Sequence, residues 1–211
     1  MKNLGLLIGL FFLTMACSST KFIDSWRNKE VQEFKPTKLL IIGMTDNLTA
    51  RNYFEEELSE AFIKRGINAQ QSINVFNGTF TNGKKSELEI DEMIANLSKE
   101  GFDAVIITAI KGVEEKENVL DNYRYVNYRW AKLGRYYYKF QDIYYTPNYY
   151  ETYKVYHIET SVYNINSDED KSLVWVGALD IVNPQKIASA IKGYNKKIIR
   201  QFEKENLIPT P

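Results

Sequence analysis

The 211-residue sequence is poor in the residues on which many catalytic and metal sites depend. It contains one histidine, His157, and one cysteine, Cys17. A zinc site built from histidine and cysteine ligands is therefore not expected, and neither is an intrachain disulfide. The 27 basic and 27 acidic residues balance, so the net charge does not suggest binding to nucleic acid. We expect no catalytic residue, no metal, no cofactor and no nucleic-acid partner, and we predict that the protein is not an enzyme.

The sequence also lacks an apolar run long enough to cross a bilayer, which takes roughly 20 residues. The run at residues 4–13 is too short for this. It follows Lys2 and precedes small residues, which is the layout of a secretory signal. We therefore predict a signal peptide over residues 1–16.

Cys17 lies where this apolar run ends, with Leu13 four positions before it and Ala16 directly before it. The arrangement resembles the lipobox of bacterial lipoproteins, although Thr14 and Met15 depart from its usual residues. The resemblance implies that the signal peptide is removed, that the thiol of Cys17 receives a diacylglycerol and that the new amino terminus is acylated. Two or more acyl chains attach a protein stably to a membrane. The alternative is an ordinary signal peptide in which the cysteine is incidental.

The residues after the predicted anchor bear on its location. Residue 18 is serine, and no acidic run follows. By resemblance to the sorting rules of bacterial lipoproteins, this favours the outer membrane, with the domain facing the periplasm. We predict a lipidated tether over residues 17–36 and a single α/β domain over residues 37–208, a length that suits one domain with a substantial core.

The first half of this domain alternates between strand and helix patterns. Residues 38–44 form a nearly continuous apolar run, as in a strand that is buried on both faces. We also predict strands at residues 67–75 and 102–110, which right-handed crossovers would make parallel to the first. The first helix is indicated by apolar residues at helical spacing, namely Tyr53, Phe54, Leu58, Ala61 and Phe62. The second follows Ser86 and Glu89, which have the spacing of a capping box.

The second half has a different pattern. Residues 153–165 and 172–182 are strand-like and are separated by turn-forming residues, which predicts an antiparallel hairpin. Asn183 and Pro184 then have the order expected at the start of a terminal helix. The predicted fold class is therefore mixed α/β. A β-α-β-α-β core is followed by a hairpin and a C-terminal helix, and helices cover a mixed sheet.

Several short motifs accompany this order of elements: Ser18-Ser19-Thr20, Ser25-Trp26, a Gly-Ile-Asn-Ala turn at Gly66 to Ala69, and Leu173-Val174-Trp175 at the end of the hairpin loop. Together they resemble a group of bacterial envelope lipoproteins. The layout is also similar to the amino-terminal domain of the translocation protein TolB, the lipoprotein activators of penicillin-binding proteins and the curli-secretion lipoprotein. The resemblance implies a fold and an envelope location, and it transfers no catalytic residue.

Tyrosine is in local excess, because twelve of the fifteen tyrosines lie between Tyr123 and Tyr156. We interpret residues 121–152 as an insertion. Its aromatic residues recur mostly at every second position and alternate with basic ones, so an extended ribbon would have an aromatic and a charged face. Tyrosine and arginine are favoured at recognition surfaces. The candidate binding residues are Tyr123, Arg124, Tyr125, Tyr128, Trp130, Arg135, Tyr136 and Tyr138. The alternative is an insertion whose rings only cover an edge of the sheet.

Other polar groups have simpler explanations. Thr45, Asp46 and Asn47 follow the first strand, where open α/β sheets bind ligands, but they lack a glycine-rich loop and suit a helix cap. No nucleophile motif accompanies His157, so we expect it to pack on a strand or lie at the surface. The acidic runs at residues 114–117 and 168–170 lack the form of a calcium loop and suit solvated turns.

These observations lead to one main hypothesis and two alternatives. We predict a non-enzymatic lipoprotein of the outer membrane that binds an envelope protein or glycan through the insertion. The second hypothesis is a small-ligand or lipid-binding module, which needs an apolar cavity of about 300 Å³ or more beneath the insertion. The third is a hydrolase that uses Asp46 and His157.

Overall fold

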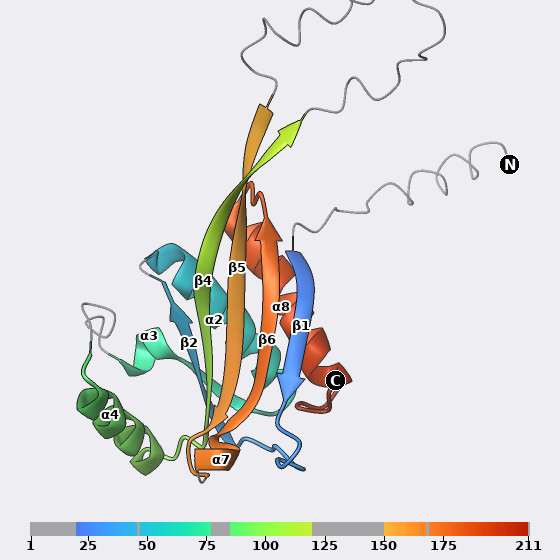
Figure 1. The fold of residues 1–211 in the computed structure, drawn as a ribbon. Coiled ribbons are helices and arrows are strands. Elements are labelled where there is room, and N and C mark those ends of the chain that lie inside the picture. Colours follow the sequence, from blue (N-terminus) through green and yellow to red (C-terminus); the bar gives the residue numbers. More distant parts are fainter. Residues whose placement is uncertain (1–19, 46, 77–84, 120–149, 168, 211) are drawn as a thin grey trace, which may run out of the picture.

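The structure is a computed structural model, and it describes residues 20–45, 47–76, 85–119, 150–167 and 169–210. Six strands among these residues form one sheet in the order β1-β6-β5-β4-β2-β3 (Figure 1). The sheet contains both parallel and antiparallel pairs, and helices pack on it. The predicted mixed α/β fold is confirmed.

The parallel part of the sheet is built around β2, Lys38–Met44. This strand pairs in parallel with β3, Asn68–Gln71, on one side and with β4, Ala104–Val119, on the other. Residues 39–43 of β2 are all buried, as the continuous apolar run predicts for a strand covered on both faces.

Two helices with clear start signals connect these strands. Helix α2, Leu48–Ile63, begins after Asn47, whose side-chain oxygen accepts a hydrogen bond from the amide of Ala50 at 3.0 Å. Its C-terminal end leads to Gly66, which has a φ of +79°. Helix α4, Glu87–Lys99, begins with the predicted capping box, in which Ser86 and Glu89 bond to each other's backbone amides. Both predicted starts are confirmed.

The second strand is shorter than predicted. Instead of continuing to residue 75, the chain leaves the sheet after Gln71 and forms the short helix α3, Ser72–Val75. The turn brings the Ser72 hydroxyl to the buried carboxylate of Glu55 at 2.6 Å, and the Ile73 amide donates to the same carboxylate at 3.0 Å. A buried carboxylate needs such donors, so the chain turns toward it.

The antiparallel part of the sheet contains the predicted hairpin. Strand β5, Tyr150–Asn164, pairs with β6, Leu173–Val182, and the short helix α7, Glu169–Ser172, precedes β6. Strand β1, Thr20–Arg27, adds an antiparallel edge to β6. The folded part of the chain therefore begins within residues 17–36, the range that we assigned to a tether.

The terminal helix α8, Ile187–Lys204, begins later than predicted. Asn183 does not cap it, because its amide donates to the carbonyl oxygen of Lys154 at 2.8 Å and its backbone adopts a φ of +45°. The first helical residue is preceded by Lys186, whose side chain makes no capping hydrogen bond. Residue 183 therefore belongs to the turn that follows β6. The predicted helix start at the Asn-Pro pair is wrong.

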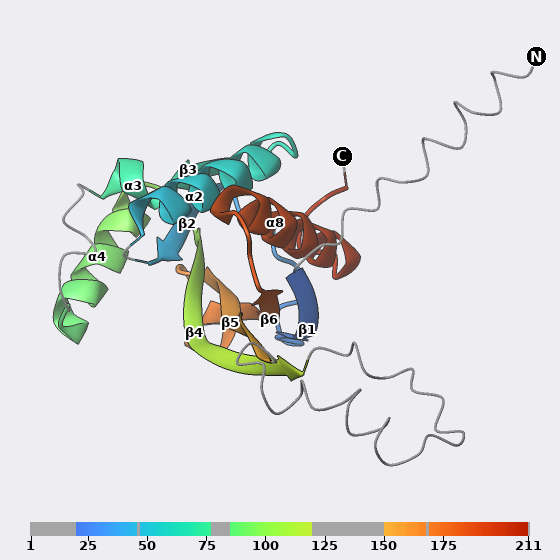
Figure 2. The ribbon, with the colours of Figure 1, turned by 90° about the horizontal axis from the view of Figure 1, so that it is seen from above.

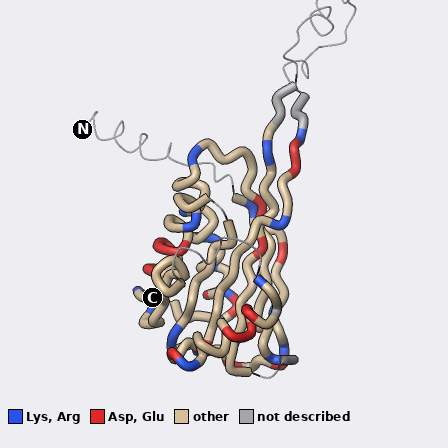
Figure 3. The backbone as a smooth tube through the Cα atoms, turned by 90° about the vertical axis from the view of Figure 1, so that its left-hand side faces the viewer, with Lys and Arg blue, Asp and Glu red and all other residues tan. Residues whose placement is uncertain are grey.

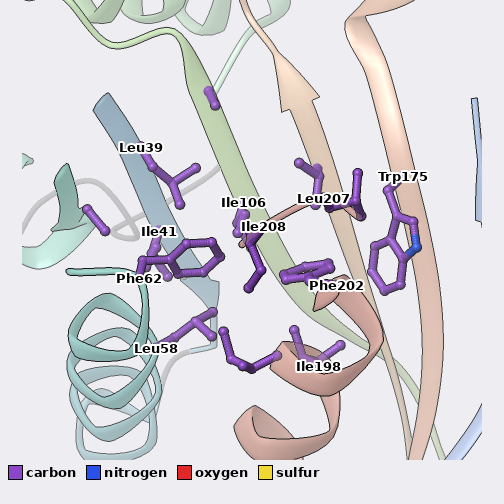
Figure 4. Packing of buried hydrophobic residues seen from close by; sticks show 14 of the residues in the cluster. Leu39, Ile41, Leu58, Phe62, Ile106, Trp175, Ile198, Phe202, Leu207 and Ile208 are labelled. Atoms are coloured by element: carbon purple, nitrogen blue, oxygen red, sulfur yellow. The ribbon is translucent and has the colours of Figure 1, made fainter. Parts of the chain in front are cut away.

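The main hydrophobic core lies between the sheet and the adjacent helices α2 and α8, which Figure 2 shows on the same side of the sheet. Figure 4 shows how Phe62 and Phe202 from these helices meet Trp175 and Ile106 from the sheet. A smaller cluster on the other face joins Leu97 of α4 to residues of β2 and β4. Alternate residues of these strands enter the two clusters, as the strand geometry requires.

Trp175 explains several of the short sequence motifs. Its fully buried ring packs edge-on against Phe202, with the ring centroids 4.8 Å apart, and it lies directly over Gly177, where a Cβ atom would collide with it. Its indole N–H donates to the Glu205 carboxylate at 2.9 Å, and the hydroxyl of Ser25 donates to the same carboxylate at 2.6 Å. The Ser-Trp and Leu-Val-Trp motifs thus tie β1 and β6 to the end of α8.

Candidate functional site

Strands β4 and β5 continue well past their neighbours in the sheet. Pairing of β4 with β2 ends at Ala109, and pairing of β5 with β6 ends at Val155, but β4 and β5 stay paired as far as Val119 and Tyr150. We call residues 111–119 and 150–154 the ribbon (Figure 1). The third strand is thus longer than the predicted range of residues 102–110, because it forms one side of this ribbon.

The ribbon carries charges of both signs, as Figure 3 shows. Lys154 lies 3.1 Å from Glu115 on the opposite strand, and Lys116 lies 3.2 Å from Glu114. All four side chains are well exposed, so each pair contributes little to stability. The acidic run at residues 114–117 was expected in a solvated turn. It lies in a strand instead.

The candidate residues of the insertion and the proposed lipidation site, Cys17, lie outside the described residues. This applies to Tyr123, Arg124, Tyr125, Tyr128, Trp130, Arg135, Tyr136 and Tyr138. The described chain does reach the base of the insertion, because Val119 and Tyr150 are paired residues at the end of the ribbon. The described residues on either side of the segment 120–149 therefore lie side by side.

His157 lies where the ribbon joins the body of the sheet. Its Nδ1 atom is 2.7 Å from the carboxylate of Asp180 on β6, and its Nε2 atom is 3.5 Å from the carboxylate of Glu114 on β4. Both ring nitrogens therefore face carboxylates of neighbouring strands. A hydrolase would need this ring to face a nucleophile or a water-binding site. Its hypothesised partner Asp46 lies outside the described residues.

The residues around Asp46 act as helix caps. Asn47 accepts the amide of Ala50, and the Thr45 hydroxyl oxygen accepts the amide of Asn47 at 3.2 Å. These bonds satisfy backbone donors at the start of α2, which is the role that the sequence favoured.

A buried charged network lies beside this helix start, and sequence reasoning missed it. Arg51 Nε is 2.9 Å from Glu55 Oε1, and Arg51 Nη2 donates to the Ser72 hydroxyl at 2.7 Å. The same Glu55 oxygen accepts the amide of Gly43 at 2.9 Å. Both charged side chains are almost inaccessible to solvent. The network fixes α2 and α3 to the end of β2.

The sequence did contain a signal for this network. Arg51 and Glu55 are four positions apart and continue the apolar stripe of Leu58 and Phe62 toward the helix start. We had placed Tyr53 on the buried face, but its side chain is 43% exposed. A charged pair at this spacing on an apolar stripe indicates a buried ion pair rather than a surface one.

A second buried polar chain crosses the sheet close by. The hydroxyls of Thr108 and Thr160 are 2.5 Å apart, and the Tyr194 hydroxyl is 2.6 Å from that of Thr160. Burial raises the pKa of the Tyr194 phenol above its ordinary value. The phenol is therefore a hydrogen-bonding group that joins α8 to β5, and it stays protonated at neutral pH.

An apolar cavity of about 90 Å³ lies between these two networks. Its lining includes Gly43, Phe54, Ile110, Ile158, Ile191 and Tyr194. Small-molecule sites usually measure about 300 Å³ or more. Within the described residues, the cavity at the base of the ribbon is therefore smaller than the ligand-binding hypothesis requires. Larger hollows of about 470 and 680 Å³ lie beside α4 and at the opposite end of the sheet, away from the ribbon.

Comparisons with known proteins give likenesses of fold only. No protein-family model matches the chain, and no curated protein matches it. The structure is similar to one chain of a PelC dodecamer from Paraburkholderia phytofirmans, at 8% sequence identity and a TM-score of 0.45, over 85% of this chain and 94% of the other. It is also similar to the lipoprotein GNA1162 from Neisseria meningitidis, at 10% identity and a TM-score of 0.43, over 80% and 99% of the two chains. The resemblance to TolB and the penicillin-binding-protein activators stays a prediction.

None of the helices that the structure describes is long and apolar enough to cross a membrane. Within the same residues, no group of three or more histidine, cysteine, aspartate and glutamate side chains could hold a metal ion.

Proposed function

We propose that this protein is a non-enzymatic lipoprotein of the bacterial envelope, anchored to the outer membrane through an acylated Cys17. In this proposal the α/β body faces the periplasm and presents the tyrosine-rich insertion, residues 121–152, to an envelope protein or glycan. Support for the anchor comes from the signal-like residues 1–16 and the lipobox-like residues before Cys17.

The ribbon is the observation that carries the binding role. The ribbon, residues 111–119 and 150–154, extends past the strands that flank it. Helices α2 and α8 do not cover this part of the β4–β5 pair (Figure 1). A two-stranded hairpin is marginally stable when it is not packed on other elements. The ribbon therefore adds little to the stability of the body. Its length is explained if it holds the insertion at a distance.

The pairing of Val119 with Tyr150 allows a clean test. Residues 120–149 are replaced by Asn-Gly, which favours a two-residue hairpin turn and keeps the ribbon intact. Crosslinking in intact cells then compares the partners of this variant with those of the full chain. We expect specific partners to disappear while the circular dichroism and melting temperature of the body are unchanged. An unchanged partner list would contradict the proposal.

A second variant separates the insertion from the ribbon. Glu115 and Lys154 are also paired, so joining them through Asn-Gly removes residues 116–153 and leaves the buried Val155 in place. If binding depends on the insertion, both variants lose the same partners. Partners that are lost only with the second variant would instead be assigned to the ribbon. Capture of polysaccharide rather than protein by the full chain would identify a glycan as the partner.

The anchor is tested independently of the insertion. Mass spectrometry of the processed amino terminus should find Cys17 acylated, and Cys17→Ala should move the protein out of the membrane fraction. If Cys17→Ala stays in that fraction and the wild-type cysteine is not acylated, the anchoring proposal is wrong.

A further inference from the structure

One end of the sheet is the meeting point of several chain segments. Strands β2, β4 and β6 all run toward it, because β2 and β4 are parallel and β6 is antiparallel to β5. Helices α2 and α8 begin there, directly after β2 and β6. The ribbon departs from it, and β1 begins there with Thr20 paired to Ile181. We call this the ribbon end.

The ribbon end exposes large apolar side chains from four different elements. Their exposed fractions lie between 46% and 60%, and they are Met44, Leu48, Ile110, Val113 and Ile187. Met44 and Ile110 line the 90 Å³ cavity, whose other lining residues include Ala50 of α2 and Ile191 of α8. Met44 and Ile110 therefore lie at one apolar hollow, and Ile187 lies one helical turn before Ile191 of its lining, so the exposed side chains gather at the same end of the sheet. Exposed apolar surfaces of this kind mark contacts with proteins or membranes.

The opposite end of α2 provides an internal comparison. Ile63 is the last residue of the helix and is 56% exposed, close to the 60% of Leu48 at its start. The residues around Ile63 are charged, however: Lys64 forms an ion pair with Glu60, and Arg65 forms one with Glu203. An isolated apolar residue among charges is normal at a surface that faces water. The ribbon end differs because its apolar residues are grouped.

The proposed anchor is close to this same end. Three residue steps separate Cys17 from Thr20, so the two Cα atoms lie at most about 11 Å apart whatever the intervening conformation. Thr20, Ile181 and Tyr156 are paired across β1, β6 and β5, and neighbouring strands lie about 4.8 Å apart. An acylated Cys17 therefore holds the ribbon end beside the bilayer.

We propose that the ribbon end docks onto the lipid surface of the membrane that holds Cys17, with Met44, Leu48, Ile110, Val113 and Ile187 in contact with the acyl-chain and headgroup boundary. This inference rests on the proposed acylation of Cys17 and adds an orientation of the body to it. The anchor limits the distance between the body and the bilayer but not the tilt of the body. Contact of the apolar surface with lipid fixes that tilt. A partner reached by the insertion would then lie in or on the same membrane, because the ribbon leaves from the docked end.

The two helix starts at the ribbon end are compatible with lipid phosphates. The first turns of α2 and α8 contain no acidic residue. Helix starts carry a partial positive charge, which favours nearby anions. The contact is therefore not opposed by acidic side chains in those two turns.

Leu48 and Ile63 form a matched pair for the test. In the full acylated chain, Leu48→Cys or Ile63→Cys supplies the only free thiol for a small fluorophore, since Cys17 is the only native cysteine and its thiol carries lipid. The labelled proteins are reconstituted into vesicles of phosphatidylethanolamine and phosphatidylglycerol, and mass spectrometry verifies acylation. Brominated lipids quench a fluorophore in the bilayer, whereas iodide quenches one in water. We expect lipid quenching at position 48 and iodide quenching at position 63.

Each other outcome overturns the inference in a recognisable way. Iodide quenching at both positions means that the body stands away from the lipid, while the anchoring proposal survives. Quenching by neither agent at position 48 means that protein covers this end, either the insertion or a second copy. An unacylated Cys17 removes the proposed anchor, and the docking inference fails with it.

A charge-insertion variant guards against a fluorophore that enters the bilayer by itself. Ile110→Glu with Ile187→Glu, added to the Leu48→Cys protein, should shift position 48 from lipid quenching to iodide quenching. The control pair is Leu88→Glu with Ile90→Glu, which changes two exposed apolar residues of α4. We expect the control to leave lipid quenching at position 48 unchanged. Equal effects of the two pairs would overturn the inference.

Discussion

The two ends of the sheet differ in the kind of side chain that they expose to solvent. At the end away from the ribbon, charged and polar groups are exposed or partly buried, and their hydrogen bonds join separate chain segments. The Asp103 carboxylate accepts the hydroxyl of Thr37 and the amides of Thr37 and Lys38, and Glu205 joins β1 and β6 to α8. At the ribbon end, the polar networks of Arg51 and Tyr194 are buried beneath an apolar surface.

At the ribbon end, the buried polar networks stabilise the fold, whereas the apolar surface above them is available for another role. Burial of a charged pair requires several well-placed hydrogen bonds, and the Arg51 network supplies them inside the ribbon end. The apolar surface above that network has no comparable structural explanation. Four predictions test this comparison of the two ends, in which the interior of the ribbon end is structural and its surface is not.

The largest effect is expected from Arg51→Met. It leaves the Glu55 carboxylate buried without its cation, and breaking a buried ion pair in this way costs about 3–5 kcal/mol. Urea unfolding followed by circular dichroism measures the loss. Arg51→Met combined with Glu55→Gln should recover much of it, because the neutral amide can still accept the amide of Gly43. If the double variant is as unstable as the single one, the charge of Glu55 is not the cause.

At the opposite end, Glu205→Ala should be the next most destabilising change. It removes the acceptor of the buried Trp175 indole and of Ser25, and a buried donor left without an acceptor costs about 1–3 kcal/mol. The unfolding midpoint in urea measures this loss, with the exposed neighbour Lys204→Ala as the control. A loss of the same size in both variants would show that the helix end, and not the carboxylate, matters.

Sequence patterns predicted the elements whose signals are local. The capping box at Ser86, the cap at Asn47 and the apolar run of β2 depend on neighbouring residues, and each lies where it was expected. The start of α8 and the end of β3 were wrong because distant contacts decide them. The Lys154 carbonyl oxygen binds the amide of Asn183 at the end of β6, and the Glu55 carboxylate binds the Ser72 hydroxyl where the chain leaves β3.

For the site too, local signals were predicted from the sequence and features that depend on distant contacts were not. The insertion was visible as a local excess of tyrosine, but the ribbon beneath it depends on pairing between residues far apart in the sequence, such as Val119 with Tyr150. The apolar ribbon end was not predicted either. Its residues come from separate elements, and only the fold brings the helix starts at Leu48 and Ile187 to the same end of the sheet. No single stretch of sequence carries that signal.

The Tyr194 hydroxyl supplies a smaller effect with a defined pH dependence. Tyr194→Phe removes its hydrogen bond to Thr160 and should cost about 1 kcal/mol at neutral pH. Burial raises the pKa of the folded phenol, whereas the unfolded chain releases this proton near pH 10. The wild type should therefore lose stability as the pH rises above about 10. Unfolding at several pH values should show a weaker decline in the variant. Equal declines in the wild type and the variant would show that the Tyr194 phenol is not the source of this pH dependence.

The smallest effect on stability is expected where the proposed docking surface lies. Leu48→Gln and Ile63→Gln change exposed residues at the two ends of α2, and each should alter the free energy of unfolding by less than about 0.5 kcal/mol. Urea unfolding of the two variants makes the comparison directly. A large loss for Leu48→Gln alone would mean that the apolar surface is part of the core and needs no partner. Two equally small changes would show that Leu48 has no larger role in folding than Ile63, as the proposed contact of the ribbon end with lipid requires.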